Sequence, residues 1–171
     1  MNAFVVDANV VHVFQEERVR EDPGIGSAAI SAVFGIGFVA LDAEEKCQTE
    51  WMNCALAKYP LNLMDWIADR MVDGKIKYWP LGDQPSFKEM TAQGIPKPDH
   101  KWIRLAKSSS AVAVITNDID LIDCKLKKAS AKIKAKVRAS GRGQTKRYIK
   151  KQTGADVICC EEVENFCSGF G

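Results

Sequence analysis

Two acidic residues stand where short apolar runs of the sequence end. Asp7 follows the run Phe4–Val6, and Asp118 follows the run Ala111–Thr116 after a single asparagine. Runs of this length and composition predict buried strands. In an open parallel sheet, ligands bind at the carboxyl ends of the strands. Two strands that each bring an acid to that edge therefore predict a site for a metal ion.

Two further acids could complete such a site. Glu50 lies at the margin of a predicted helix, and Asp99 follows a proline where another helix is expected to begin. Mg²⁺ and Mn²⁺ prefer oxygen ligands, whereas carboxylates gathered without a cation or a proton repel one another. A bound cation lowers the pKa of water and neutralises charge on a phosphoryl group. Hydrolysis of a phosphodiester needs both effects.

Each of the four acids also has an ordinary structural explanation. Asp7 and Asp118 could turn or cap the chain after a strand. Asp99 suits a helix N-cap by residue type, and Glu50 could be a surface acid on a helix. Only the four acids taken together favour a metal site over these local roles.

Apolar runs and helical stripes alternate along the chain. Strands are predicted at 4–6, 38–41, 76–79, 111–116 and 157–160. Helices are predicted at 10–15, 28–35 (capped by Ser27), 42–56 (capped by Asp42), 63–71, 98–106, 119–123 and 161–166. Within the fourth helix, Trp66, Ile67 and Met71 are expected to face inward, and residues 80–98 are expected to form a long loop. This alternation predicts an α/β fold, a three-layer α/β/α sandwich with a central parallel sheet.

Charge is distributed unevenly over the 171 residues. The formal net charge is +2, with 46% hydrophobic and 27% charged residues, as in ordinary globular proteins. The segment 125–151 carries 12 Lys and Arg and no Asp or Glu, so the rest of the chain has a formal charge of −10. We interpret residues 1–171 as a single domain with a basic insertion at about 125–151. Such an insertion suits a polyanion-binding surface, and a solvated lysine-rich helix is the alternative.

The cysteines and histidines argue against other classes of site. Six cysteines show no Cys-x-x-Cys pair, and His12 and His100 do not stand at ligand spacing, so a zinc site is not expected. The N-terminus shows no signal-peptide pattern, and no apolar run approaches the length of a membrane span. We therefore expect reduced thiols in a cytoplasmic protein that has no membrane partner.

In their order and spacing, the acidic segments resemble the PIN domain, a metal-dependent nuclease fold. Each segment is common by itself, and the order of all four carries the resemblance. The matching segments are Val5–Val10, Leu41–Trp51 with Glu50, Asp99–Ala106 and Val114–Leu121, followed by a last strand at 156–160.

The resemblance implies a role for each matching residue. Mg²⁺ or Mn²⁺ would be the cofactor, with Asp7, Glu50, Asp99 and Asp118 as its ligands. Asp120 would be an accessory acid, and Asp123 is a further candidate. Asn9 and Thr116 would orient the site by hydrogen bonds. The implied activity is cleavage of single-stranded RNA, often by a homodimer.

The basic insertion is longer than a compact member of that family needs. It would also suit structured RNA or DNA. Its cations would bind phosphates without reading the base sequence; the expected contacts are Arg142, Lys146, Arg147, Lys150 and Lys151. Tyr148, Trp79 and Phe87 could stack on bases, with packing against the protein core as the favoured role.

The sequence supports two functions and leaves a third weaker one. The first is a metal-dependent endoribonuclease that acts as a toxin with an antitoxin partner, in RNA processing or in defence. The second is a PIN-like module that binds nucleic acid or protein without cutting. A phosphatase or receiver-like domain is the third, but it would require a lysine late in the chain at the end of a strand, and none is found there.

Overall fold

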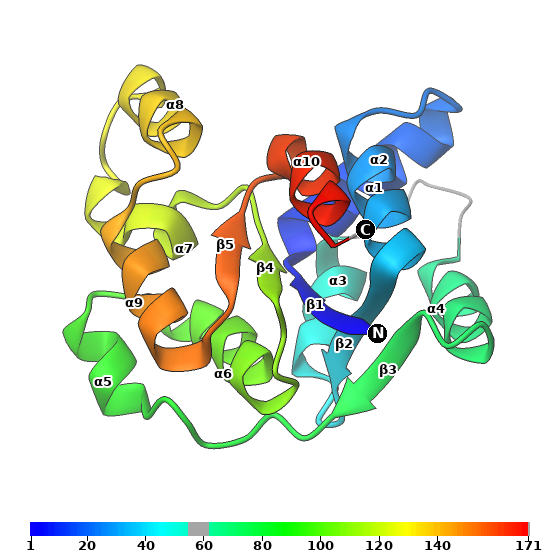
Figure 1. Cartoon of the computed structure of the whole chain (residues 1–171), viewed down its shortest axis with the longest axis horizontal. Coiled ribbons are helices and arrows are strands. Elements are labelled where there is room, and N and C mark those ends of the chain that lie inside the picture. The colour runs from blue at the N-terminus through cyan, green and yellow to red at the C-terminus, as the bar shows by residue number, and fades with distance from the viewer. Residues whose placement is uncertain (55–61, 171) are drawn as a thin grey trace.

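A parallel five-stranded sheet forms the centre of the computed structural model, which describes residues 1–54 and 62–170. The strand order is β3–β2–β1–β4–β5 (Figure 1). The strands are β1 (Asn2–Val6), β2 (Gly37–Asp42), β3 (Ile76–Trp79), β4 (Ala113–Ile115) and β5 (Asp156–Ile158). All four strand pairings are parallel. The predicted α/β fold with a central parallel sheet is confirmed.

Helices connect the strands throughout the described ranges. They are α1 (Ala8–Arg20), α2 (Ile25–Ile36), α3 (Lys46–Cys54), α4 (Leu63–Val72), α5 (Phe87–Ala92), α6 (His100–Ser108), α7 (Ile119–Asp123), α8 (Ala131–Ala139), α9 (Gln144–Thr153) and α10 (Val163–Ser168). Short 3-10 turns are η1 (Lys97–Asp99), η2 (Cys124–Leu126) and η3 (Cys160–Glu162). Helix α6 packs on β1, β2 and β4 and contacts α9, whereas α2 packs on β2 and contacts α1 and α10. The helices thus flank the sheet in a three-layer sandwich (Figure 1).

The two central strands are buried on both faces. Phe4, Val5 and Val6 of β1 have no exposed surface, and neither do the three residues of β4. A strand that lies inside a covered parallel sheet is expected to be apolar throughout, which is why the sequence predicted both. At Gly37 a side chain would meet the backbone of β1, because an added Cβ would lie 2.1 Å from the carbonyl oxygen of Asn2.

The order of the strands creates a crevice at one point of the sheet. From β1 the chain moves outward through β2 to β3, and it then returns to the other side of β1 for β4 and β5. The connections therefore diverge between β1 and β4, and ligands of open α/β sheets bind at this type of switch point. Asp7 follows β1 and Asp118 follows β4, so both acids border it.

The second helix begins earlier than its sequence predicts. Ser27 was expected to cap it, but α2 starts at Ile25. The free amides of Gly26 and Ser27 donate to the carboxylate of Glu17, at 2.9 and 2.6 Å. A cap supplied by a side chain from the preceding helix leaves no local signal in the sequence. The first helix is also longer than 10–15, because α1 continues to Arg20.

Sequence expectations for the segments around α3, α4 and α5 have mixed outcomes. The segment 80–98 is not one long loop, because Ser86 and Glu89 form a capping box that starts α5. Met71 does not face inward, since its side chain is 44% exposed. The predicted end of the third helix at 55–56 lies outside the described residues. The Asp42 carboxylate does cap α3 by accepting hydrogen bonds from the amides of Lys46 and Cys47, but the helix begins at Lys46 rather than directly after Asp42, which ends β2.

All six cysteines are free thiols. Among the described residues, no helix is long and apolar enough to cross a bilayer.

Candidate metal centre

The four acids predicted as ligands line a single cleft of about 390 Å³. They reach it from four places in the fold: Asp7 from the end of β1, Glu50 from α3, Asp99 from η1 and Asp118 from the end of β4. The other residues that line the cleft are Ala8, Asn9, His12, Asn53 and Cys54. Residues up to 111 positions apart in sequence therefore share one site at the carboxyl edge of the sheet.

Asp7 is held in place by its neighbours. Its side chain is buried, with the residue only 4% exposed. One carboxylate oxygen, Oδ2, accepts hydrogen bonds from the Thr116 hydroxyl and the Asn9 amide, both at 2.6 Å. The backbone amide of Asp7 donates to the carbonyl of Ile115 at 2.9 Å, which extends the pairing of β1 with β4. The Asp7 carboxylate is thus fixed at the switch point.

Asn9 and Thr116 also join the loop after β1 to the loop after β4. The hydroxyl oxygen of Thr116 accepts a hydrogen bond from the amide of Asp118 at 2.9 Å. The side-chain oxygen of Asn9 accepts one from the amide of Asn117 at 3.0 Å. One hydroxyl therefore contacts both Asp7 and the backbone of Asp118, and it sets the spacing between the two acids.

We predict that Thr116→Val destabilises the protein by about 1–3 kcal/mol, because the replacement keeps the shape but leaves buried partners without a hydrogen bond. Urea unfolding monitored by circular dichroism measures the change. Thr116→Ser retains the hydroxyl and is the matched control. Equal stability of the two variants would contradict this role for the hydroxyl.

Asp99, Asp118 and Asp120 form a close group of acids. One oxygen from each lies within 4.8 Å of the others. Asp118 also caps α7 by accepting a hydrogen bond from the Asp120 amide at 2.9 Å. Asp120 is 5% exposed, and its Oδ1 has no hydrogen-bond partner among the described residues. A buried carboxylate oxygen without a donor is costly, so this atom has the environment of a ligand for a cation.

Burial and mutual repulsion perturb two of the acids. Burial, more than the nearby charges of Asp118 and Glu50, raises the pKa of Asp7 from 3.8 to about 6. Burial is also the main cause that raises the pKa of Asp99 from 3.8 to about 7, followed by repulsion from Asp118, Asp7 and Asp120. Acids that resist ionisation in this way are stabilised by a divalent cation, which offsets both effects.

Glu50 reaches the cleft but already has a basic partner. The next residue, Trp51, is fully buried, and its indole donates to the carbonyl of Val6 at 3.0 Å, which anchors α3 beside Asp7. The Glu50 carboxylate forms an ion pair with the ammonium of Lys101. A second lysine, Lys127, pairs with Asp120 Oδ2 at 2.8 Å. The sequence did not predict either ion pair, because two residues that meet from different helices or turns have no characteristic spacing along the chain.

The donor set fits a hard divalent cation. It consists of carboxylate oxygens, with a hydroxyl and an amide supporting them, and this is the ligand chemistry that Mg²⁺ and Mn²⁺ prefer. Two of these carboxylates, Glu50 and Asp120, are paired with Lys101 and Lys127, so a bound cation would compete with the two ammonium groups. Asp123 accepts hydrogen bonds from the amides of Lys125 and Gln144, and its role as a further acid of the site stays a prediction.

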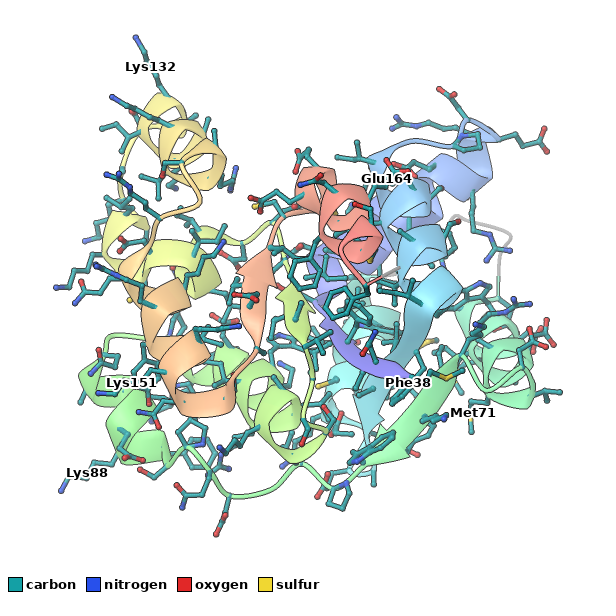
Figure 2. All side chains as sticks on the ribbon, viewed as in Figure 1. Phe38, Met71, Lys88, Lys132, Lys151 and Glu164 are labelled. Carbon is teal, nitrogen blue, oxygen red and sulfur yellow. The ribbon has the colours of Figure 1, made fainter. Side chains whose placement is uncertain are left out.

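The predicted basic contacts lie on α9 and the turn before it. Lys150 pairs with Asp156 at 2.8 Å, and Asp156 begins β5. Lys150 is therefore at the amino edge of the sheet, opposite to the acids. Lys151, next to it, extends outward from the end of α9 (Figure 2). Their proposed contact with nucleic acid, like that of Arg142, Lys146 and Arg147, stays a prediction.

Two other cations of the insertion lie closer to the acids. Lys134 and Arg138 of α8 line a small cleft together with Asn9 and Asp118. The sequence did not single out these residues among the 12 basic positions of the insertion. Helical spacing places them one turn apart on the same face of α8, which was the available signal.

The three aromatic candidates behave differently. Tyr148 and Trp79 are partly buried and pack against the core, as favoured, and Trp79 stacks on Phe38 with ring centroids 5.2 Å apart. Phe87 does not pack in the core, because it is 55% exposed. The preference for core packing was wrong at this residue.

Comparison with protein-family models, with curated proteins and with solved structures found no match to this chain. Support for a function therefore comes from the fold and from the candidate centre.

Proposed function

We propose that this protein is a divalent-metal-dependent endonuclease that hydrolyses phosphodiester bonds of RNA. The observation that carries the proposal is the convergence of acids from separate elements on one cleft, with a buried oxygen of Asp120 that has no partner in the described structure. The PIN-like order of the same acids along the sequence agrees with this function.

In this proposal, Asp7, Asp99, Asp118 and Asp120 hold the cation, and Glu50 joins them when it releases Lys101. The chemistry that Mg²⁺ or Mn²⁺ supplies when bound is a lowered pKa of water and neutralisation of charge on the phosphate. Thr116 and Asn9 keep the Asp7 carboxylate oriented through their hydrogen bonds. Preorganised ligands of this kind reduce the reorganisation needed during reaction.

Positive charge beside the acids supports a polyanionic substrate. Lys134 and Arg138 lie on one side of Asp118, and Lys101 lies on the side of Glu50. Cations placed around an acidic centre attract phosphates toward it and offset the negative potential of the carboxylates.

One observation favours a second candidate, a nucleic-acid-binding module that does not cut. The ion pairs of Lys101 with Glu50 and of Lys127 with Asp120 offset the charge of two of the acids without any metal. In that case the acids would be structural, and divalent cations would have little effect on the protein.

The decisive experiment is incubation of purified protein with end-labelled single-stranded RNA in Mg²⁺, in Mn²⁺ or in EDTA. We expect internal cleavage with either cation, none in EDTA, and recovery when the cation is restored. The Asp118→Asn variant, purified in parallel, controls for a contaminating nuclease. Cleavage that persists in EDTA would refute the proposal, and RNA binding without any cleavage would favour the second candidate.

A further inference from the structure

A second cleft, of about 480 Å³, adjoins the acidic one. It lies between the start of α3, the segment after β3, helix α5 and the start of α6. The residues that line it are Glu44, Lys46, Thr49, Leu81, Phe87, Lys97, Pro98, Lys101 and Arg104. We refer to it as the α5–α6 cleft.

Positive charge dominates the α5–α6 cleft. Four of its lining residues are cationic: Lys46, Lys97, Lys101 and Arg104. Its one acid, Glu44, accepts hydrogen bonds from the backbone amide of Leu81, at 3.0 and 3.3 Å to its two oxygens. A concave surface with this excess of cations attracts a negatively charged ligand.

An exposed aromatic ring lies within the same cleft. The guanidinium carbon of Arg104 lies 4.0 Å from the centroid of the Phe87 ring. The guanidinium itself donates to the carbonyls of Asp83, at 2.7 Å, and Pro85, at 3.1 Å. Arg104 is therefore held in position, and more than half of the Phe87 surface remains free. Aromatic rings beside cations are the usual stacking platforms for unpaired bases.

Residues adjacent in the sequence line the α5–α6 cleft and the acidic cleft. Thr49 lines the α5–α6 cleft, and the next residue, Glu50, lines the acidic cleft. In the same way, Pro98 lines the α5–α6 cleft and Asp99 lines the acidic cleft. Lys101 lines the α5–α6 cleft while its ammonium pairs with Glu50. Consecutive Cα atoms are about 3.8 Å apart, so a single extended ligand can occupy both clefts.

We propose that the α5–α6 cleft binds the stretch of single-stranded RNA that flanks the bond to be cut, with one base stacked on Phe87 and the phosphates beside Lys97 and Lys46. The position of the cut relative to this cleft rests on the proposed nuclease function, whereas the binding of the strand does not depend on it. A base inside a duplex is already stacked on its neighbours and cannot cover Phe87, so the cleft selects unpaired strands. The basic insertion would then be a secondary contact.

Fluorescence anisotropy in EDTA tests this proposal without cleavage, using a fluorescein-labelled single-stranded RNA of mixed sequence. We expect Phe87→Ala to weaken binding roughly 5- to 150-fold, because base stacking is worth about 1–3 kcal/mol per base. Phe87→Tyr keeps a stacking ring and should bind as the wild type does. Lys88→Ala is the matched control: Lys88 is the next residue on α5, it extends outward into solvent (Figure 2), and it does not line the cleft.

A second RNA, in which abasic sites replace the bases, separates stacking from loss of structure. The wild type should bind it more weakly, and Phe87→Ala should cause no further loss. Wild-type affinity in Phe87→Ala, or an equal loss with the abasic strand, would overturn the proposal. If Phe87-dependent binding is observed in a protein that does not cleave RNA, this inference stands and the proposed nuclease function fails. Cleavage and RNA binding that both proceed unchanged in Phe87→Ala would support the nuclease function and overturn this inference.

Discussion

Asp7→Asn is expected to reduce cleavage at least about 100-fold while making the metal-free protein more stable at pH 8. Loss of activity follows because the substitution removes a charged oxygen donor from the centre, and even residues that only support metal ligands cost about 10- to 100-fold when replaced. The gain in stability follows from the environment of the carboxylate.

The stabilisation can be bounded from the pKa of Asp7. Burial raises that pKa from 3.8 to about 6, so ionisation at pH 8 costs the folded state at most about 3 kcal/mol relative to the unfolded chain. Asparagine carries no charge and retains an oxygen that accepts from Asn9 and Thr116. We therefore expect a gain of about 1–3 kcal/mol, or a melting temperature roughly 3–10 °C higher.

Thermal unfolding in EDTA at pH 8 measures this effect, and the RNA cleavage assay measures the loss of activity. Asp69→Asn is the control, since Asp69 is exposed on α4 far along the sheet from the centre. It should change neither quantity. A less stable Asp7→Asn variant would show that the carboxylate is structural, which is the role that a local cap after β1 would give it.

Affinity for Mn²⁺ is expected to fall about 100-fold or more between pH 8 and pH 5. A cation binds the ionised carboxylates, so protons compete with it below the pKa of each acid. Those pKa values are about 6 for Asp7 and about 7 for Asp99. Below its own pKa, each acid therefore lowers the affinity for Mn²⁺ by up to about tenfold per pH unit.

The raised pKa values of Asp7 and Asp99 also determine whether the metal-free protein becomes more or less stable as pH rises. Both acids bind protons more tightly in the folded than in the unfolded chain, where an aspartate titrates near 3.8. Between about pH 4 and pH 7 the folded state thus holds more protons, and its free energy of unfolding decreases as pH rises. Metal-free protein should be more stable at pH 5 than at pH 8, and Mn²⁺ should reverse this order.

Isothermal titration calorimetry with Mn²⁺ at several pH values, in buffers that do not bind metals, measures the affinity. Asp7→Asn should show a shallower dependence on pH than the wild type, because one titrating group is gone. An affinity independent of pH would mean that the acids of the cleft do not bind the cation.

Much of the fold could be predicted from the sequence because its central strands are short apolar runs without competing patterns. The runs that became β1 and β4 are buried on both faces, and each ends in an acid at the switch point. The placement of Asp7 and Asp118 on one cleft was predicted in the same way, since topology fixes the edge of the sheet at which parallel strands end. Glu50 and Asp99 do not follow strands, and their place in the same cleft was expected only from the order and spacing of the acidic segments. Whether these acids bind a metal stays a prediction.

The failures share a physical origin in contacts between distant elements. Glu17 caps the helix that follows its own, and Lys101 neutralises an acid on another helix. The exposure of Phe87 depends on how α5 is seated against Arg104. None of these contacts produces periodicity or local spacing, so a single sequence does not reveal them.

Lys101 lines the α5–α6 cleft and pairs with Glu50 of the acidic cleft, and this makes the occupancies of the two clefts interdependent. A divalent ion that displaces its ammonium from Glu50 returns one positive charge to the neighbouring groove, where an incoming phosphate would meet it. Thermodynamic reciprocity then requires that a bound strand strengthen ion binding by the same factor by which the ion strengthens strand binding. A molecule coupled in this way would hold its ion most tightly when its polyanion is already in place.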